Sequence, residues 1–407
     1  ALYSEPILPK TYLQFSYQYQ YKYSKSDRGT YDLSNINANF FDVDADYRQW
    51  DSYLSFLGNA SLDNYRDNKL SRYSEYKNYI HTADVMLRVI KKDYNFNVGV
   101  QVVPQKSHFV QDYQSVHTDT TRTVTNVTPT ADFRWKISKL SQLRFTYRGN
   151  TSQPSMTDLL DITDDSNPLN VKKGNPGLKP SFTQNFRLFY NNYIQNHQRS
   201  IMAHLMFSTT DNSISNMVTY DKTTGGRTTR PENINGNWNA FGMFMFNTAI
   251  DTAAYFNVNT FTTVNYSNSV GYVSVDKADS QKSTTRTTNL SERIAASYRN
   301  DWLEFELNGS LSYMHARSKL QANNNLDTWT FSYGASLMLT APWGTQLSSG
   351  LNMNSRRGFS DSSMNTNELI WNAQLSQSFL RGNALTVSLQ LYDILHQQST
   401  FSRTVNA

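Results

Sequence analysis

Five basic side chains carry the chemistry that stands out first in this sequence. They occupy alternating positions in three neighbouring segments rich in Phe, Tyr and Leu, and they are Arg134, Lys136, Arg144, Arg148 and Arg187. A β-strand puts alternate side chains on one face, so adjacent strands would bring these cations together. Such a cluster can hold the carboxylate or phosphate of a ligand, or an acidic protein surface. The alternative is a wall of ion pairs with a structural role alone.

A second set of charges follows later in the chain. Arg293 and Arg299 alternate with apolar residues, and Glu304 and Glu306 lie on the corresponding face of the next segment. Opposite charges on adjacent strands attract one another, so we expect the acids to pair with Arg293 or Arg299. This set predicts a salt-bridged wall that keeps a channel interior wet.

The sequence gives little support for a metal site or a catalytic site. One acidic stretch, with Asp42, Asp44 and Asp46, could hold Ca²⁺ through carboxylate oxygens. It lacks the glycine turn and closing glutamate of an EF-hand, so a solvated loop is the alternative. The His residues lack ligand spacing, and nothing near His108 or His117 selects a catalytic triad. We expect no enzyme and no cofactor.

The segments that carry these residues alternate in steps of two. In residues 385–391 every second residue is Leu or Val, and Thr, Ser and Gln lie between them; residues 13–23 and 94–102 repeat the pattern. One apolar and one polar face is what a transmembrane β-barrel needs, with lipid outside and water or a plug inside. We expect an antiparallel meander of about fifteen bilayer-crossing strands. The alternation orients six residues: Phe182, Leu188, Val387 and Leu389 toward lipid, and Arg187 and Gln390 toward the lumen.

Composition agrees with this fold class. The chain has 407 residues, no Cys, 26 Tyr and a net charge of +5. Its mean hydropathy is −0.61, and no run approaches the ~18 apolar residues of a membrane helix. The basic residues are dispersed, which is unlike a nucleic-acid-binding surface. No linker interrupts the chain, so we expect one barrel domain over residues 1–407; the alternatives are a soluble β-sandwich or β-helix.

The connections are expected to alternate in length. Short turns are predicted at Lys91–Asp93, Leu140–Gln142, Gln195–Gln198, Asp251–Ala254, Asn300–Asp301, Pro342–Gly344 and Arg381–Asn383. Long loops are predicted at Lys25–Arg72, Pro104–Thr123, Asn150–Pro180, Thr209–Gly236, Asn268–Thr288, Ala316–Leu326 and Arg356–Asn367. In outer-membrane barrels the short turns are periplasmic and the long loops extracellular. A two-residue turn at Asn300 would pair Tyr298 with Leu303.

Aromatic residues gather at the predicted short turns. They are Tyr94, Trp135, Tyr193, Tyr255, Tyr298, Trp302, Trp343 and Phe379. Amphipathic rings favour the headgroup level of a membrane, so these residues predict the periplasmic aromatic girdle.

One loop passage carries a family resemblance. It contains Pro154-Ser155, then Asn167-Pro168-Leu169, then Gly174-Asn175-Pro176-Gly177-Leu178-Lys179-Pro180, directly before a predicted strand. The prolines fix φ, and Ser155 could cap one helical turn over residues 155–160. The passage resembles one in the barrels of TonB-dependent receptors, in the spelling of the outer-membrane β-barrel family of Bacteroidetes. Ser181 departs from the pattern, because the family often has Glu there.

The resemblance implies the later part of a barrel of about 22 strands, with the plug and first strands outside this sequence. The last strand runs outward and ends near Ala407 without a return strand, which also predicts further strands. The resemblance implies an outer-membrane receptor that imports a large or scarce solute. Implied partners are outer-membrane lipid and lipopolysaccharide, an N-terminal plug, TonB and a surface lipoprotein, with no nucleic acid. A passive porin and a structural or adhesin barrel are the alternatives, and the sequence does not name the solute.

Overall fold

The computed structural model describes residues 2–32, 62–113, 116–160, 163–164, 167–221, 223–274, 278–320, 325–379 and 384–398. Sixteen of its strands form one large sheet. Their bounds are β1 Leu2–Leu8, β2 Thr11–Arg28, β3 Arg72–Ile90, β4 Tyr94–Tyr113, β5 Val116–Lys136, β6 Ser141–Ser152, β9 Ser181–Ile194, β10 Arg199–Asp211, β13 Asn237–Ala249, β14 Phe256–Val273, β15 Gln281–Arg299, β16 Leu303–Ser318, β17 Leu326–Thr340, β18 Thr345–Arg357, β19 Asn367–Phe379 and β20 Leu385–Leu391.

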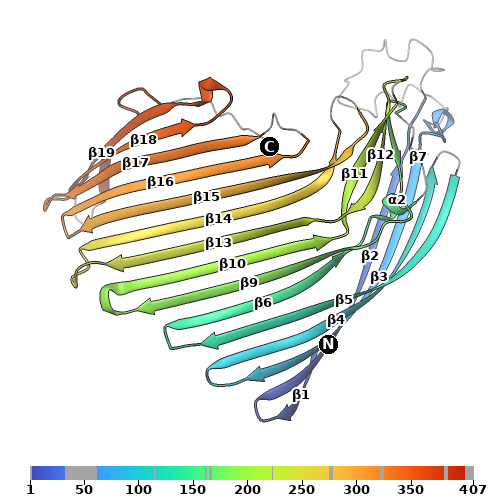
Figure 1. Cartoon of the computed structure of the whole chain (residues 1–407), viewed down its shortest axis with the longest axis horizontal. Helices are drawn as coiled ribbons and strands as arrows, with labels where there is room; N and C mark the ends of the chain where they lie inside the picture. The colour runs from blue at the N-terminus through green and yellow to red at the C-terminus, as the bar shows by residue number, and fades with distance from the viewer. Residues whose placement is uncertain are drawn as a thin grey trace.

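These strands pair in chain order, as the alternating pattern predicts. Each neighbour in the sheet is the next of these strands along the chain, and among the described residues strands of another sheet intervene between β6 and β9 and between β10 and β13. The pairs are antiparallel throughout, for example β9 with β10 and β10 with β13. Figure 1 shows the result as one curved sheet of long strands. The predicted all-β antiparallel meander is confirmed.

The sheet contains one strand more than the sequence pattern indicates. The additional strand is β1, which folds back on β2 through a turn at Pro9 and Lys10, where Lys10 has a φ of 61°. Glu5 and Pro6 interrupt the hydrophobic alternation of this segment, which is why the pattern does not reveal it. β1 and β20 are the two ends of the strand order, and they pair with β2 and β19 respectively.

Short turns lie at one end of the sheet and longer connections at the other, as predicted. β3 and β4 are joined by residues 91–93, β9 and β10 by 195–198, and β15 and β16 by 300–302. These turns lie along the left edge of Figure 1, and the longer connections lie on the opposite side. The turn between β9 and β10 contains the 3-10 helix η3 Asn196–Gln198. Two further 3-10 helices lie in long connections, η2 Leu62–Tyr65 and η5 Ser362–Met364.

Two predicted long loops are instead mostly strand of the large sheet. The predicted loop Pro104–Thr123 is wrong, because β4 and β5 continue as a ribbon and only residues 114–115 separate them. The predicted loop Asn268–Thr288 shrinks to residues 274–280 for the same reason. Both segments are polar, but they are rich in Thr and Val, which favour extended backbone. A polar stretch of sequence therefore indicates that a strand extends beyond the membrane, and it does not indicate where that strand ends.

The two faces of the sheet separate as the alternation predicts. Leu188 lies opposite Leu205 and Phe145, whereas Arg187 lies opposite Met206 and Thr146. The Leu389 side chain is 59% exposed rather than buried between two sheets. We call the face that carries Leu188 and Leu389 the apolar face, and the face that carries Arg187 the polar face.

The apolar face carries an aromatic row toward the long-connection end. Ring centroids lie 4.8 Å apart for Tyr147 and Phe186, 6.1 Å for Phe186 and Phe207, and 5.9 Å for Phe207 and Trp238. Trp238 stacks on Tyr266 at 4.9 Å. The row forms a second aromatic band, opposite the one at the short turns, that the sequence reading did not identify. Two such bands delimit the apolar zone of a transmembrane barrel.

The Glu292 carboxyl group lies among apolar side chains of the apolar face. Glu292 lies between Leu290 and Ile294 on the same side of β15, directly opposite Thr262 and Leu311. The Thr262 hydroxyl donates a hydrogen bond to the Glu292 carboxylate. This local partner offsets part of the cost of a polar group on an apolar surface.

A second, smaller sheet forms from the long connections. It has the order β11-β12-β8-β7, with β11 Ser213–Tyr220, β12 Arg227–Ile234, β8 Asn170–Lys173 and β7 Thr163–Asp164. The short helix α2, Met156–Leu159, lies beside it, and Figure 1 draws this group near the upper ends of β2 to β5. Among the described residues no helix is long and apolar enough to cross a membrane.

Candidate functional site: the polar wall and the rim pocket

The five predicted basic residues share the polar face. β5 and β6 pair so that Arg134 lies opposite Arg144 and Thr130 lies opposite Arg148. Thr146, between the two arginines of β6, lies opposite Arg187 of β9. Lys136 continues the same side of β5 toward the short turn. We call these five residues the basic wall.

Only one residue of the basic wall makes an ion pair within the described part of the chain. The Arg144 guanidinium donates two hydrogen bonds to the Asp132 carboxylate, at 2.9 and 2.7 Å. The Thr146 hydroxyl donates to the same oxygen at 3.0 Å, which holds Asp132 in place. Across the described residues, no carboxylate lies within ion-pair distance of the other four cations. The wall therefore has a positive field on its polar side.

A cavity of about 390 Å³ opens against this wall. Its lining comes from β6, β9 and β10: Arg144, Thr146, Arg148, Asn185, Arg187, Phe189 and His204. The cavity combines three guanidinium groups with one amide, one hydroxyl and two rings. Guanidinium groups present forked donors that match carboxylate or phosphate oxygens, so this cavity can accept an anion.

The second predicted charge set behaves differently. Arg299 lies opposite Glu304, and its guanidinium donates to that carboxylate at 2.5 Å. Glu306 lies opposite Ser297 and accepts from the Asn308 amide at 3.5 Å. The predicted pairing of Glu304 with Arg299 is confirmed, and this part of the sheet is neutral by comparison with the basic wall.

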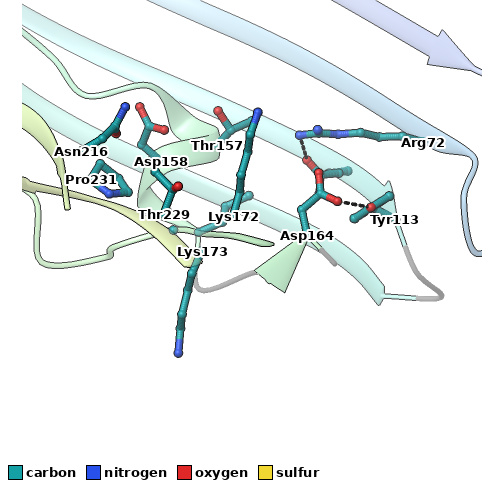
Figure 2. Close-up of a pocket in the computed structure, with 13 residues that line it drawn as sticks. Arg72, Tyr113, Thr157, Asp158, Asp164, Lys172, Lys173, Asn216, Thr229 and Pro231 are labelled. Carbon is teal, nitrogen blue, oxygen red and sulfur yellow. Dashed lines mark hydrogen bonds between the residues drawn. The ribbon is translucent and has the colours of Figure 1, made fainter. Parts of the chain in front are cut away.

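A second cavity, of about 350 Å³, lies at the long-connection rim where the small sheet meets the large one. Arg72 and Gln111 come from β3 and β4, and the opposite side comes from β8, β11, β12 and α2. The full lining is Arg72, Gln111, Tyr113, Thr157, Asp158, Leu160, Asp164, Lys172, Lys173, Gly174, Asn216, Thr229 and Pro231. We call this cavity the rim pocket (Figure 2).

Hydrogen bonds fix the base of the rim pocket. The Arg72 guanidinium donates to the Gln111 side-chain oxygen at 2.9 Å, and the Gln111 side chain is almost completely buried. The Tyr113 hydroxyl donates to the Asp164 carboxylate at 2.6 Å and so ties β7 to the end of β4. Lys172 and Lys173 point in opposite directions from β8, which Figure 2 shows. The pocket thus offers cations, carboxylates, amides and hydroxyls to one bound group.

The motif passage builds the wall behind this pocket. Asn175 is 95% buried: its amide nitrogen donates to the Pro231 carbonyl at 2.9 Å, and its side-chain oxygen accepts from Gly177 N at 3.0 Å. Arg230 also donates to that oxygen, at 3.1 Å. A Cβ added at Gly174 would lie 1.7 Å from the Leu160 carbonyl oxygen, so only glycine fits there.

The remaining motif residues surround this junction. Leu178 is buried, and Ser155 caps α2 by accepting from Asp158 N at 3.1 Å, as predicted. Pro154 directly precedes the cap, and Pro176 and Pro180 belong to the irregular stretch before β9. Of the six motif residues, Pro154, Gly174, Asn175, Pro176, Leu178 and Pro180, it is the hydrogen-bonded Asn175, the buried Leu178 and the closely packed Gly174 whose surroundings order the loop.

The other candidate residues do not assemble into a site in the part of the chain described. Asp42, Asp44 and Asp46 lie outside the described residues. His108 contacts Asp119 at 2.7 Å, and His117 contacts Asp112 at 2.6 Å, both between the tips of β4 and β5. Within the described ranges, no cluster of three His, Asp or Glu side chains could hold a metal ion.

The rim pocket is the feature that sequence reasoning missed. Its lining residues are separated by up to 159 positions, from Arg72 to Pro231, so no local motif unites them. The available signal was the proline- and glycine-rich passage, which indicated a folded loop that could lean over the barrel mouth.

Comparison with known proteins supplies the family. No curated protein matches the chain. Among solved structures, the outer membrane transporter YddB from Escherichia coli is similar at 10% sequence identity. The alignment covers 97% of this chain and 70% of the YddB chain, and its TM-score of 0.28 is too low to support an argument. A sequence model of the outer membrane protein β-barrel family matches residues 40–299 and 294–407. The chain therefore belongs to the outer membrane protein β-barrel family and is an integral protein of the outer membrane.

Proposed function

We propose that this barrel forms the outer-membrane part of a receptor that captures and imports a large or scarce solute. The observation that carries the proposal is the rim pocket, where a folded small sheet lies against β3 and β4 and is hydrogen-bonded to the end of β4 through Tyr113 and Asp164. Its 350 Å³ falls within the range of small-molecule sites. An ordered polar pocket at the mouth suits selective capture better than free diffusion.

The basic wall would act after capture. Its cavity lies on the polar face of β6, β9 and β10, with Arg148 and Arg187 in its lining. Acidic groups of a solute, or an acidic surface of a plug domain, would be attracted there. Neither role requires a catalytic group, so we propose a transport protein without enzyme activity.

Energy for import would come from the periplasm. By resemblance to TonB-dependent receptors, TonB would act on a plug domain inside a barrel of about 22 strands, of which these strands form the later part. The short turns would be periplasmic and the small sheet extracellular. A surface lipoprotein could cover the mouth from outside.

Electrical recording tests the central proposal against a passive porin. The full native protein, purified from outer membranes, is inserted into a planar lipid bilayer. A plugged receptor is expected to give no stable conductance until urea displaces the plug, after which stepwise openings appear. Stable openings without urea would overturn the receptor proposal in favour of a porin.

A second measurement separates a receptor from a structural or adhesin barrel. Cells that produce the protein are grown on single nutrient sources, with and without an uncoupler of the proton gradient. A receptor predicts a nutrient whose uptake requires both the protein and the gradient. If deletion of the gene changes cell adhesion or shape and alters uptake of no nutrient, the structural alternative replaces the proposal.

A further inference from the structure

Three arginines project from the apolar side of the sheet near its long-connection end. Arg286 of β15 shares the side of Ile294, because the pairing with β14 and β16 runs without a break between them. Arg317 of β16 lies directly opposite Arg286. Arg357 of β18 lies opposite Trp329, a residue of the same side. All three are exposed, and we call them the outer arginine patch.

Aromatic rings place this patch at the edge of the apolar zone. The rings of Tyr313 and Trp329 lie 4.2 Å apart, and the Arg357 guanidinium lies 6.0 Å from the Phe331 ring. Arg317 is four residues beyond Tyr313 on β16, which is about 13 Å along a strand. Tyr and Trp mark the headgroup level of a bilayer. The patch therefore extends from the ring level into the headgroup layer.

The outer arginine patch contains more cationic side chains than there are acidic side chains paired with it. Asp327, 3.5 Å from Arg317, is the only carboxylate that pairs with the patch among the described residues. His315 lies 3.8 Å from the same carboxylate, so even this acid is shared. Arg286 donates to the neutral Asn268 amide oxygen at 3.3 Å, and Arg357 donates to the Asn367 amide oxygen at 2.7 Å.

Two other basic groups on the same side of the sheet have acidic partners. On the outer side of β3 Lys77 pairs with Glu75, and between β4 and β5 His108 pairs with Asp119. Two arginines directly opposite each other repel, so the Arg286–Arg317 pair costs stability unless an anion lies between them. This pair spans β15 and β16, and β16 also carries Tyr313 of the Tyr313–Trp329 aromatic pair.

We propose that the outer arginine patch binds the phosphate of an anionic lipid headgroup in the leaflet at the long-connection rim. Guanidinium forks bind phosphate oxygens with paired hydrogen bonds, and their attraction is strongest near a low-dielectric surface. The acyl chains of the lipid would lie along the apolar face below, against Ile294 and Leu311. A phosphate between Arg286 and Arg317 removes their repulsion and fastens this side of the barrel to its lipid.

Lipid retention tests the proposal. The full native protein is reconstituted in phosphatidylethanolamine nanodiscs that contain bisphosphorylated lipid A, or lipid A from which both phosphates have been removed. Retained lipid is measured by native mass spectrometry during titration. The double variant Arg286→Gln/Arg317→Gln is expected to bind phosphorylated lipid A roughly tenfold to thirtyfold more weakly than the parent.

Arg293→Gln is the matched control, because Arg293 lies on the same strand but on the polar face. It should retain phosphorylated lipid A as the parent does. Equal weakening by Arg293→Gln, or no weakening by the double variant, would overturn the proposal. The parent alone provides a test that needs no variant: equal retention of lipid A with and without phosphates would also overturn it. Displacement of the lipid by millimolar inorganic phosphate would indicate a free-anion site instead.

Discussion

Two stretches of the same polar face handle their charges in opposite ways. The basic wall of β5, β6 and β9 sets five cations beside Asp132, whereas β15 and β16 set Arg293 and Arg299 beside Glu304 and Glu306. A paired wall satisfies its charges locally and needs no further ligand. An unbalanced wall keeps a field that acts on whatever enters the lumen. The role of an arginine on the polar face is therefore decided by the number of acidic residues beside it, and not by its being on that face alone.

The largest effect should come from moving a cation to the wrong side of the sheet. Leu205 on the apolar face and Met206 on the polar face are neighbours on β10, and Met206 lies opposite Arg187. Leu205→Arg should destabilise the barrel by about 2–4 kcal/mol, while Met206→Arg should cost less, because its only penalty is repulsion from Arg187 directly opposite on the wet face. Reversible refolding in lipid vesicles measures both variants. Equal costs would show that the two faces are assigned wrongly.

Removing one acid from each wall should give the next largest difference. Asp132 holds Arg144 through two hydrogen bonds and is 22% exposed, so Asp132→Asn should cost about 1–3 kcal/mol. Arg299 is 67% exposed, so loss of its partner in Glu304→Gln should cost about 0–1 kcal/mol. The same refolding assay compares the two. A larger cost for Glu304→Gln would mean that the paired wall contributes more to stability.

Charge selectivity should report the field of the basic wall. After urea has opened the pore, Arg148→Gln/Arg187→Gln should lower the preference for chloride over potassium by roughly twofold. Arg293→Gln, a cation from the other wall, should change it less. Reversal potentials in a salt gradient measure this preference. If Arg293→Gln has the greater effect, the basic wall is not the dominant field.

The sequence predicts the strands and the two faces of the sheet well, and it predicts the pairing register between neighbouring strands less well. The basic wall follows from the period-two pattern, because it lies wholly on adjacent strands. The predicted pairing of Tyr298 with Leu303 is wrong by two residues: Tyr298 lies opposite Phe305. The cause is local: Asn300 donates its N–H to the Leu303 carbonyl and accepts from Leu303 N, both at 2.8 Å, so the turn lies at Asp301 and Trp302. The shift of two preserves the face, so the error does not disturb the wall.

The rim pocket could not be predicted in the same way. Its residues meet because the Asn175 side chain fastens the motif passage to Pro231 of β12, a contact across 56 positions. Hydrophobic alternation does not predict such contacts, because the conformation of a loop depends on its hydrogen bonds and on the backbone angles that its residues allow. The cap at Ser155 was predictable, since it involves only neighbours along the chain.

The smallest effect is expected at the turn between β13 and β14, between the basic half of the sheet and the paired half. The Asp251 carboxylate accepts from Phe256 N at 2.7 Å and from Tyr255 N at 3.1 Å. The Phe256 hydrogen bond is the main cause that lowers the pKa of Asp251, and the Tyr255 bond adds to it. A carboxyl whose pKa is lower in the folded state stabilises the fold above its unfolded pKa. That contribution is lost as the pH falls through the folded-state pKa.

Asp251→Asn keeps one of the two accepting oxygens, replaces the other with an amide NH2 and removes the charge. At neutral pH the parent should be slightly more stable than Asp251→Asn, and the difference should vanish in acid. Unfolding by denaturant in lipid vesicles, repeated from neutral to acidic pH, measures this difference. A difference that stays constant across the range would assign the effect to turn geometry. A difference that grows in acid would contradict the direction of the pKa shift of Asp251. The pH dependence of stability would then be assigned to the acidic residues of the two walls.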